Sequence, residues 1–383
     1  MMKILFVTPY YYPEVQFGGP PRRIHTMSRH LIARGHAVRV LTFHSNRPQS
    51  TGNIEQDGVQ TTYLPWLGSG LRQIPSSKRA ANDAVNRADI IHCYGLYNLL
   101  VPMASFLAAK KDKPFLLEPM GMYVPRVKNV LAKRFYNATL TRWMTNQASA
   151  LVATSRIEQK ELSELAINTP IVIRRNGIDI SDWESLPSRT TARGRWNIEE
   201  RDKLVVYIGR ISAKKCLLQL VSAFIEADVP SSRLIIAGPV SEVSYRRELL
   251  RVIQSSNRAA SIRLEGAVYD DELKGLLAAA DLFVLPSLNE NFGNAAGEAV
   301  AAGVPVLLTD TCGIARLIHG RAGMSVPLGL EALTKGIRSM LDSEICHQMT
   351  ARRAEVKREL SWDGPIQQTE ELYERIIRNS KRR

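Results

Sequence analysis

The sequence is poor in cysteine and lacks any long apolar run, and each absence excludes a class of protein. The 4 cysteines among 383 residues lie far apart, without a CxxC pair or a Cys/His spacing, so we expect neither a disulfide framework nor structural zinc. No apolar run approaches the roughly 20 residues that span a bilayer, and segment 1–7 is too short for a signal peptide. These absences favour a cytoplasmic protein with reduced cysteines: Cys93, Cys216, Cys312 and Cys346.

The sequence also lacks repeats and low-complexity tracts. Hydrophobic residues make up 45% and charged residues 23% of the chain, which is typical of an ordered globular protein, and its length is typical of two domains. Acidic residues are scarce in the first half: residues 1–180 hold 23 of the 51 Lys and Arg but only 11 of the 37 Asp and Glu. We therefore expect the first half to face something anionic, either nucleic acid or a membrane surface or diphospholipid acceptor.

The most informative stretch is 281–306, DLFVLPSLNENFGNAAGEAVAAGVPV. The apolar run 282–285 predicts a buried strand of a parallel sheet. A polar loop follows, then a helix of small residues over 295–302, which Gly303 and Pro305 end. Because ligands of such sheets bind at the carboxyl ends of the strands, the loop is a candidate binding site.

The loop's chemistry suits a phosphorylated sugar. Asn294 is a candidate N-cap, and the amides around it would present a positive helix end to an anion. Glu290 and Glu298 flank these amides, where carboxylates could accept hydrogen bonds from sugar and ribose hydroxyls. A purely structural interpretation makes Glu298 a partner of the helix dipole and Glu290 a solvated loop charge; it is weaker for two carboxylates together than for one.

The segment from Glu290 to Glu298 resembles the E-x7-E motif of the retaining glycosyltransferases of family four. The resemblance continues through 299–306 and along nearly the whole chain. It implies the GT-B fold, in which two doubly wound Rossmann-like α/β domains face each other across a cleft. It also implies that Glu290 contacts the donor sugar and Glu298 the ribose. The residues it assigns to donor binding are Gly18, Gly19, Arg210, Lys215, Val268, Tyr269, Glu290, Asn291, Phe292, Gly293, Asn294 and Glu298.

Two cations follow the first strand of the second half. Arg210 and Lys215 come after the apolar run 204–208 and, taken alone, could be solvated loop charges. A departing diphosphate gains negative charge, which fixed cations would stabilise without a metal. The pair resembles the family's G-R-x4-K motif, with Cys216 in place of the Gly that often follows. With Glu290, these two are the expected catalytic residues; nothing resembles a DxD metal motif, so no metal and no other cofactor is expected.

The first half begins as a βαβ unit: strand 3–8, a helix after Gly18 and Gly19, and strand 37–43. The glycine pair permits close approach of a ligand, and in the family such a loop touches donor phosphates or acceptor. Segment 89–95 resembles the family's D-x-x-H-x-H, with His92 at the first His and Tyr94 at the second. His92 alone is more often a satisfied core residue. Met120 stands where family members often have His or Arg.

The resemblance sets the expected domains and activity. They are an acceptor-side domain over 1–178, a nucleotide-sugar domain over 179–361, and a C-terminal helix over 362–383 that packs back on the first domain. The expected activity is transfer of a sugar from a UDP- or GDP-sugar to a glycan or lipid-linked acceptor in cell-surface polysaccharide or glycoconjugate biosynthesis, with retention of configuration. Alternatives are a nucleotide-sugar epimerase or phosphorylase on the same plan, and a non-catalytic anion- or nucleic-acid-binding protein; no nucleic acid is expected under the main interpretation.

A basic helix is expected over 125–144, with an apolar stripe through Val127, Leu131, Phe135 and Ala138. With Lys128 and Lys133 on its polar side, it could lie on the inner face of the cytoplasmic membrane. The alternative is that the stripe packs into the first domain.

Overall fold

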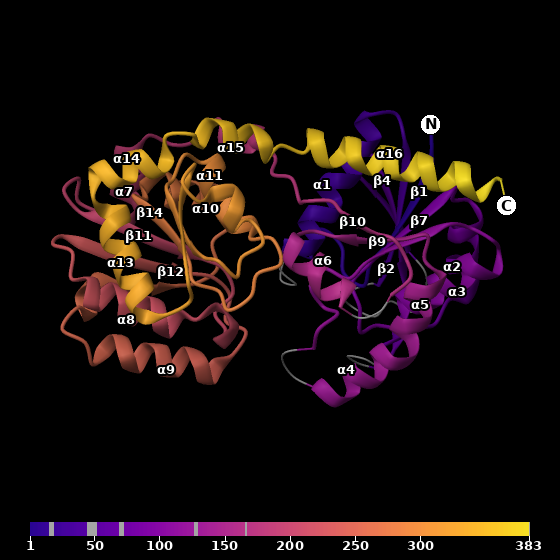
Figure 1. Ribbon diagram of the computed structural model, residues 1–383, viewed down its shortest axis with the longest axis horizontal. Coiled ribbons are helices and arrows are strands. Elements are labelled where there is room, and N and C mark those ends of the chain that lie inside the picture. Colours follow the sequence, from indigo (N-terminus) through magenta and orange to yellow (C-terminus); the bar gives the residue numbers. More distant parts are fainter. Residues whose placement is uncertain (15–18, 44–51, 69–72, 126–128, 165–166, 383) are drawn as a thin grey trace. The chain divides into compact units, whose positions relative to one another are not determined.

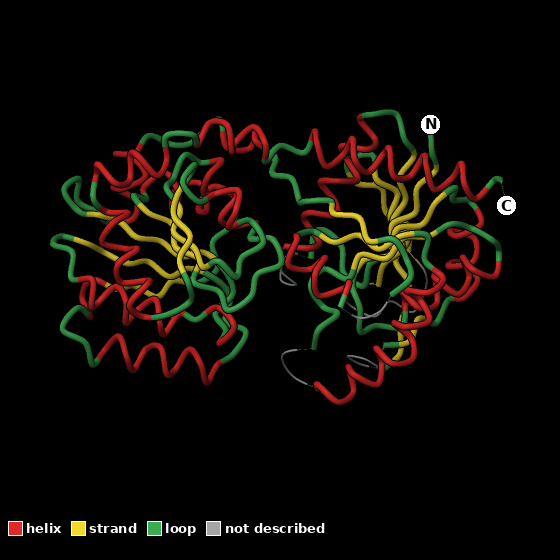
Figure 2. Tube along the Cα trace, in the orientation of Figure 1, coloured by secondary structure: helices red, strands yellow, loops and turns green. Residues whose placement is uncertain are grey.

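The computed structural model describes residues 1–383 except 15–18, 44–51, 69–72, 126–128, 165–166 and 383. The chain divides into two compact units, each built around its own sheet (Figures 1 and 2). Unit 1 comprises Met1–Asn176 and Trp362–Arg383, and unit 2 comprises Gly177–Ser361. The chain thus passes from unit 1 to unit 2 and returns to unit 1 for its last helix.

Unit 1 contains, among its described residues, an eight-stranded sheet of order β10-β9-β8-β7-β1-β2-β4-β3. Neighbouring strands are parallel except for the β3–β4 hairpin. The strands are β1 (Lys3–Val7), β2 (Ala37–Phe43), β3 (Gly52–Gln56), β4 (Val59–Leu64), β7 (Ile90–Tyr94), β8 (Phe115–Glu118), β9 (Ala150–Ala153) and β10 (Ile171–Ile173), with a separate pair β5 (Trp66–Leu67) and β6 (Ile74–Pro75).

Helices cover both faces of this sheet, because alternate residues of each strand point to opposite sides. Leu5 and Val7 belong to one core, which also holds residues of α2 and α3, whereas Ile4 and Phe6 belong to the other, with residues of α1 and α16. The helices of unit 1 are α1 (Gly19–Ala33), α2 (Lys78–Asn86), α3 (Leu100–Lys110), α4 (Val130–Tyr136), the π-helix η3 (Asn137–Thr141), α5 (Arg142–Gln147), α6 (Arg156–Ser163) and α16 (Asp363–Ser380).

The last helix, α16, is part of unit 1. Its Tyr373 is fully buried, and the Tyr373 hydroxyl lies 2.6 Å from Nδ1 of His92. Glu370 of the same helix accepts hydrogen bonds from Arg34 at 3.0 Å and pairs with His36 at 2.8 Å. These contacts join the end of the chain to β7 and to its first βαβ unit.

Unit 2 has a six-stranded sheet of order β13-β12-β11-β14-β15-β16 within the described residues, and its neighbouring strands are all parallel. Its strands are β11 (Lys203–Ile208), β12 (Ser232–Ala237), β13 (Ile262–Glu265), β14 (Leu282–Leu285), β15 (Val306–Thr309) and β16 (Gly323–Val326). The residues of β14 are buried on both faces, as its uninterrupted apolar run predicts.

The helices of unit 2 connect these strands and complete a second α/β layer structure. They are η4 (Ile180–Trp183), α7 (Arg189–Trp196), η5 (Ala213–Lys215), α8 (Leu217–Ala227), α9 (Val243–Gln254), η6 (Ala259–Ser261), α10 (Asp270–Ala279), α11 (Asn294–Ala301), α12 (Ala315–Ile318), α13 (Leu330–Leu341), α14 (Ser343–Thr350) and α15 (Arg353–Glu359).

Some expected elements are wrong in detail. Segment 46–80 has a weak sequence pattern that predicts mainly loops, but it contains the hairpin β3–β4, of which β3 is exposed along most of its length. The expected helix 125–144 is described from Val130 onward, is interrupted by η3, and continues as α5; Val127 and Lys128 lie outside the described residues. The sequence pattern over 345–360 predicts a single helix, whereas the structure has two, α14 and α15. In the part of the chain that the structure describes, no helix combines the length and apolarity needed to cross a membrane.

Candidate active site

The candidate site lies where the order of the unit 2 strands reverses. β11 and β14 are neighbours, and the chain continues from β11 toward one edge of the sheet and from β14 toward the other. In parallel sheets such a switch point leaves a crevice outside the carboxyl ends of the two strands. The loop after β11 carries Arg210 and Lys215, and the loop after β14 carries Glu290.

Lys215 and Glu290 form an ion pair across this switch point. Nζ of Lys215 donates to Oε2 of Glu290, although the two residues are 75 positions apart in the chain. Burial alone would raise the pKa of Glu290, but the charge and hydrogen bond of Lys215, with smaller contributions from Lys214 and Arg210, lower it below its ordinary value. Glu290 is therefore held as a carboxylate that accepts hydrogen bonds.

The loop that carries Glu290 is held by the loop after β15. The Glu290 amide donates to the Thr311 carbonyl at 3.2 Å, and the Gly313 amide donates back to the Glu290 carbonyl at 2.9 Å. The Thr311 hydroxyl also donates to the Ser287 carbonyl at 2.6 Å, and the Ser287 hydroxyl lies 3.5 Å from Oε2 of Glu290. Backbone pairing on both sides thus fixes the direction of the carboxylate.

Helix α11 begins directly after this loop, and its N-cap is Gly293, not the expected Asn294. Gly293 has φ of 106°, which favours glycine over any residue with a side chain. A Cβ there would also lie 3.2 Å from Cγ2 of Ile314. Asn294 is therefore the first residue of the helix, and a positive backbone angle, which the sequence pattern did not indicate, decides the helix start.

The remaining expected donor residues surround this helix end. Phe292 is buried, Asn291 is half-buried, and Glu298 is half-buried about one turn into α11. Arg210 is exposed, while its backbone carbonyl accepts a hydrogen bond from the Tyr207 hydroxyl at 3.0 Å.

Cys216, which follows Lys215, adopts φ of +52°. This left-handed conformation explains why a glycine would suit the position, because only glycine adopts it without steric cost. The half-buried Cys216 keeps the turn in spite of that cost and caps the start of α8.

Val268 and Tyr269 follow β13, two strands away from β11 in the sheet. Val268 is buried, whereas Tyr269 is 43% exposed and precedes the first residue of α10. An exposed ring at the carboxyl edge of the sheet is available to stack on a flat ligand. Tyr269 is therefore on the same edge as the Lys215–Glu290 pair.

The candidate residues of unit 1 differ in outcome. Gly18 lies outside the described residues, and Gly19 is exposed as the first residue of α1. His92 and Tyr94 are buried, stacked at 4.2 Å between ring centroids. His92 is thus a core residue whose Nε2 lies 3.4 Å from Oε2 of Glu118 without a hydrogen bond, and neither ring is exposed to a ligand. Met120 has φ of +56° and its sulfur accepts a hydrogen bond from Arg23 at 2.9 Å.

Sequence patterns did not point to Ser287 or Lys214 as site residues. The proximity of Lys214 to Glu290 depends on the pairing of β14 with β11, which no local pattern indicates, whereas Ser287 lies three positions before Glu290 in the same loop. The polar residues that end each parallel strand were the only available signal. Among the described residues, no group of three or more His, Cys, Asp or Glu side chains could hold a metal ion.

Two family models match the chain in succession. The model for Glycosyltransferase Family 4 matches residues 17–182, and the model for Glycosyl transferases group 1 matches residues 188–357. Both models describe glycosyltransferases, and two units with mainly parallel sheets are typical of the GT-B fold. Within that class, the chain belongs to glycosyltransferase family four.

Relatives of stated activity match almost the whole chain. A glycogen synthase of Mycobacterium tuberculosis is 28% identical, covering 97% of this chain and 94% of the relative. A GDP-mannose:cellobiosyl-diphosphopolyprenol alpha-mannosyltransferase of Xanthomonas oryzae is 24% identical over 93% of each. Among solved structures, HepE of Anabaena in complex with UDP and glucose has a TM-score of 0.77 at 20% identity, over 97% of this chain and 99% of that one, which shows the shared fold.

Proposed function

We propose that this glycosyltransferase moves a sugar from a UDP- or GDP-sugar to a glycan or lipid-linked acceptor, with retention of anomeric configuration, in cell-surface polysaccharide or glycoconjugate biosynthesis. The observation that carries this proposal is the Lys215–Glu290 pair beside the start of α11. The pair places a fixed carboxylate next to a fixed cation at the point where the order of the unit 2 strands reverses.

Each charge has a distinct task in the proposed site. The ionised Glu290 accepts hydrogen bonds from donor sugar hydroxyls, since its pKa is lowered and it has no proton to give. Glu298, about one turn further along α11, accepts from the ribose hydroxyls. Lys215, Arg210 and the amides at the start of α11 stabilise the diphosphate, so that a metal ion is not needed for this charge.

The proposed reaction proceeds on one face of the donor sugar. The bond from the anomeric carbon to the diphosphate oxygen breaks, and the acceptor hydroxyl bonds to the same carbon from the same side. The acceptor's proton passes to the departing diphosphate oxygen. Glu290 does not serve as a nucleophile in this scheme, because its carboxylate is engaged by Lys215.

The names of the relatives support a nucleotide-sugar donor. One relative is named for GDP-mannose, and a structural neighbour was solved with UDP and glucose. The excess of Lys and Arg over Asp and Glu in residues 1–180 supports work in the cytoplasm at the inner face of the membrane, where an acceptor carried by an anionic lipid would be presented.

A panel of nucleotide sugars tests the proposal. A UDP- or GDP-sugar at many times its dissociation constant should stabilise the protein by roughly 2 kcal/mol or more in thermal unfolding. NMR of the product should show the same anomeric configuration as the donor. Stabilisation by heparin or duplex DNA with a steep salt dependence, and by none of the donors, would instead support the polyanion-binding alternative.

A further inference from the structure

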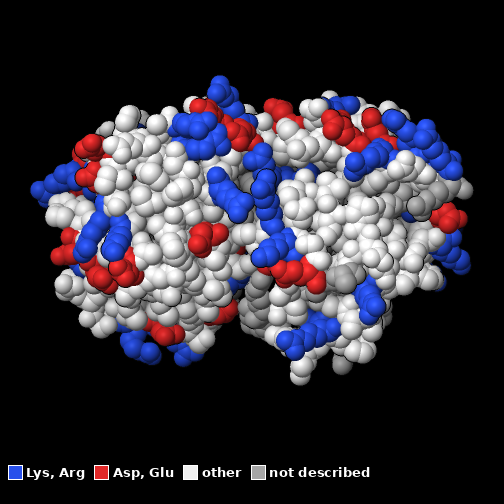
Figure 3. All heavy atoms as spheres, viewed as in Figure 1, with Lys and Arg blue, Asp and Glu red and all other residues white. Residues whose placement is uncertain are grey.

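Two long segments of the chain are free of acidic residues, 15–54 and 119–157, and the second forms part of the surface of unit 1. Between Glu118 and Glu158 the sequence contains no Asp or Glu, while it contains six cations: Arg126, Lys128, Lys133, Arg134, Arg142 and Arg156. The described part of this segment includes α4, η3 and α5. Figure 3 shows Lys and Arg, without Asp or Glu, at the tip of unit 1 that α4 forms. This segment therefore presents positive charge that no neighbouring carboxylate in the sequence offsets.

One side of the segment is fixed to unit 1. The buried Tyr136 donates its hydroxyl to the Asn98 carbonyl at 2.6 Å. The Asn137 side-chain amide donates to the Tyr123 carbonyl at 2.7 Å, and the Thr141 hydroxyl donates to Oδ1 of Asn137 at 3.0 Å. These contacts determine which side of α4 and η3 faces outward.

The outward side is apolar. Leu131 is 79% exposed and Phe135 is 72% exposed, and residues four positions apart lie next to each other on a helix surface. Ala138 is also exposed. The alternative, that this stripe packs into the first domain, is thus wrong for its two largest described members, Leu131 and Phe135. Two adjacent exposed large apolar side chains are typical of a binding surface.

The cations of this surface are not all those expected from the sequence. Lys133 turns inward, with Nζ 5.1 Å from the centre of the Tyr97 ring, and burial lowers the pKa of Lys133. Arg134 and Arg142 are the exposed cations on α4 and α5. They flank the apolar stripe, as cations do on helices that lie at a lipid interface.

A neighbouring helix extends the same surface. Phe106 of α3 is 53% exposed, and its ring centre lies 6.1 Å from that of Trp143 on α5. Lys110, one turn further along α3, is exposed. Aromatic rings of this kind are favoured at the level of lipid headgroups.

We propose that the outward side of α4, η3 and α5 docks on an anionic lipid bilayer, with Leu131 and Phe135 inserted between lipids and Arg134 and Arg142 on the headgroups. The proposal rests on the proposed function insofar as the acceptor is lipid-linked, and it names the surface that meets the lipid. A second copy of the chain is a poorer occupant, because a two-fold contact would bring identical, acid-free surfaces together.

Sedimentation with vesicles tests this surface in the full-length protein. Vesicles of phosphatidylcholine with phosphatidylglycerol should bind the protein, vesicles of phosphatidylcholine alone should bind it far less, and added salt should release it. The double variant Leu131→Ala/Phe135→Ala should weaken binding to the anionic vesicles by about tenfold or more. Arg134→Glu/Arg142→Glu should weaken it too and should reduce its dependence on salt.

Exposed residues of unit 2 provide matched controls. Val243 is 64% exposed on α9, which also carries the exposed Arg246 and Arg247. Val243→Ala shortens an exposed apolar side chain on α9, and Arg246→Glu/Arg247→Glu reverses two exposed cations on the same helix. Neither variant should change vesicle binding. In a variant Phe135→Trp, tryptophan emission should shift to shorter wavelength with anionic vesicles, and lipids brominated in the acyl chain should quench it.

Four results would overturn the docking surface: equal binding to neutral and anionic vesicles, no binding to either, full binding by the α4 variants, or a concentration-dependent dimer that these variants abolish. Donor-induced stabilisation, measured without vesicles, should be equal in all variants. If donor binding holds and vesicle binding fails, the docking proposal alone is wrong. If vesicle binding depends on Leu131 and Phe135 but no donor binds, the proposed transferase chemistry is wrong and the surface stands.

Discussion

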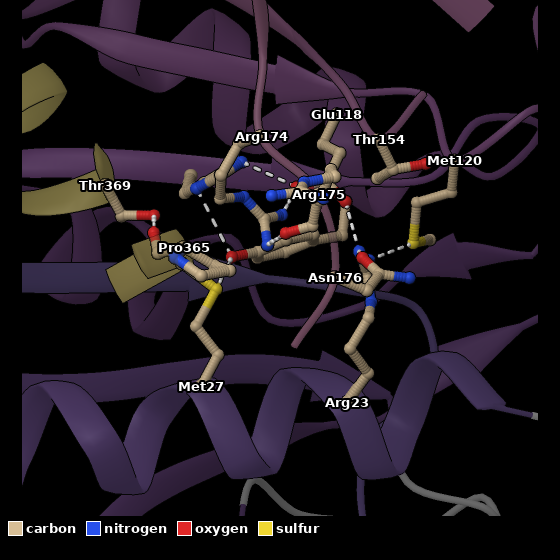
Figure 4. Close-up of polar contacts among 12 residues, drawn as sticks. Arg23, Met27, Glu118, Met120, Thr154, Arg174, Arg175, Asn176, Pro365 and Thr369 are labelled. Carbon is tan, nitrogen blue, oxygen red and sulfur yellow. Dashed lines mark hydrogen bonds and ion pairs between the residues drawn. The ribbon is translucent and has the colours of Figure 1, made fainter. Parts of the chain in front are cut away.

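Nη1 of Arg23 lies 2.6 Å from Oε1 of Glu118, and both side chains are buried. Arg174 pairs with the second oxygen of the same carboxylate, and Arg23 also donates to Oδ1 of Asn176 at 2.5 Å. Figure 4 shows Arg23 reaching from α1 toward Glu118, with Arg174 and Asn176 beside it. One carboxylate thus joins α1, β8 and the last residues of unit 1 before the chain enters unit 2.

Glu118→Ala should strongly destabilise the protein. The change leaves Arg23 and Arg174 buried without their carboxylate, and removal of one partner from a buried pair costs about 3–5 kcal/mol. Urea unfolding of the variant measures the loss. Glu331→Ala is the control, since Glu331 pairs with Lys335 on the surface of α13 and should hardly change the midpoint. Equal effects of the two substitutions would contradict the central role of Glu118.

His92 should make the protein sensitive to mild acid. Burial lowers the pKa of His92 despite the nearby Glu118 carboxylate. Below the ordinary pKa of 6.5 the unfolded chain binds a proton that folded His92 does not, so stability is complete above pH 6.5 and declines as pH falls. His92→Gln removes this difference, so the slope of unfolding free energy against pH between 6.5 and 5 should fall by up to about 1.4 kcal/mol per pH unit.

Urea unfolding at several pH values gives the slope of unfolding free energy against pH, which is compared between the wild type and His92→Gln. His25, whose pKa is also lowered chiefly by burial, remains in the variant and leaves part of the slope. An unchanged slope in His92→Gln would mean that His92 is protonated in the folded protein.

The sequence was sufficient to predict the α/β class, because uninterrupted apolar runs such as 282–285 mark strands buried on both faces. The GT-B fold followed from the resemblance to family four and not from these runs. The sequence also indicated Lys215 and Glu290 separately. Their pairing could not be derived, since it depends on β11 lying beside β14. Nor could the role of Arg23, whose carboxylate partner is 95 positions away in the chain. Local patterns specify elements, whereas ion pairs across a sheet depend on strand order.

The positive φ of Cys216 predicts that a glycine variant is more stable than a valine variant at this position. Cys216→Gly should change the unfolding free energy by no more than about 1 kcal/mol, because relief of the left-handed conformation offsets the loss of a half-buried side chain. Cys216→Val should be less stable than the glycine variant by about 1–2 kcal/mol, since a β-branched residue resists this conformation. Cys346→Val, in the ordinary helix α14, serves as control. A valine variant at least as stable as the glycine variant would contradict the assigned backbone angle.

Kinetics should separate the proposed donor residues. Glu298→Ala should weaken donor binding by about tenfold, because a ribose hydrogen bond to a carboxylate is present in the ground state. Arg210→Ala and Lys215→Ala should mainly lower kcat, by about 10²-fold or more, because diphosphate charge grows toward the transition state. Arg246→Ala on α9 should match the wild type. Unchanged kcat in both cation variants would remove them from the catalytic assignment.

The Lys215–Glu290 pair predicts one further difference, in pH dependence. Lys215 is the main source of the lowered pKa of Glu290, and burial acts in the opposite direction. In the wild type, Glu290 is therefore ionised through mildly acidic pH, and donor binding loses its contribution only below the carboxyl's ordinary range. In Lys215→Ala the pKa of Glu290 should rise, so that donor affinity declines at a higher pH as acid is added. Isothermal titration of a nucleotide sugar at several pH values measures this. In the double variant Lys215→Ala/Glu290→Gln, donor affinity should not show this additional decline in acid. If the decline persists in the double variant, a group other than Glu290 causes it.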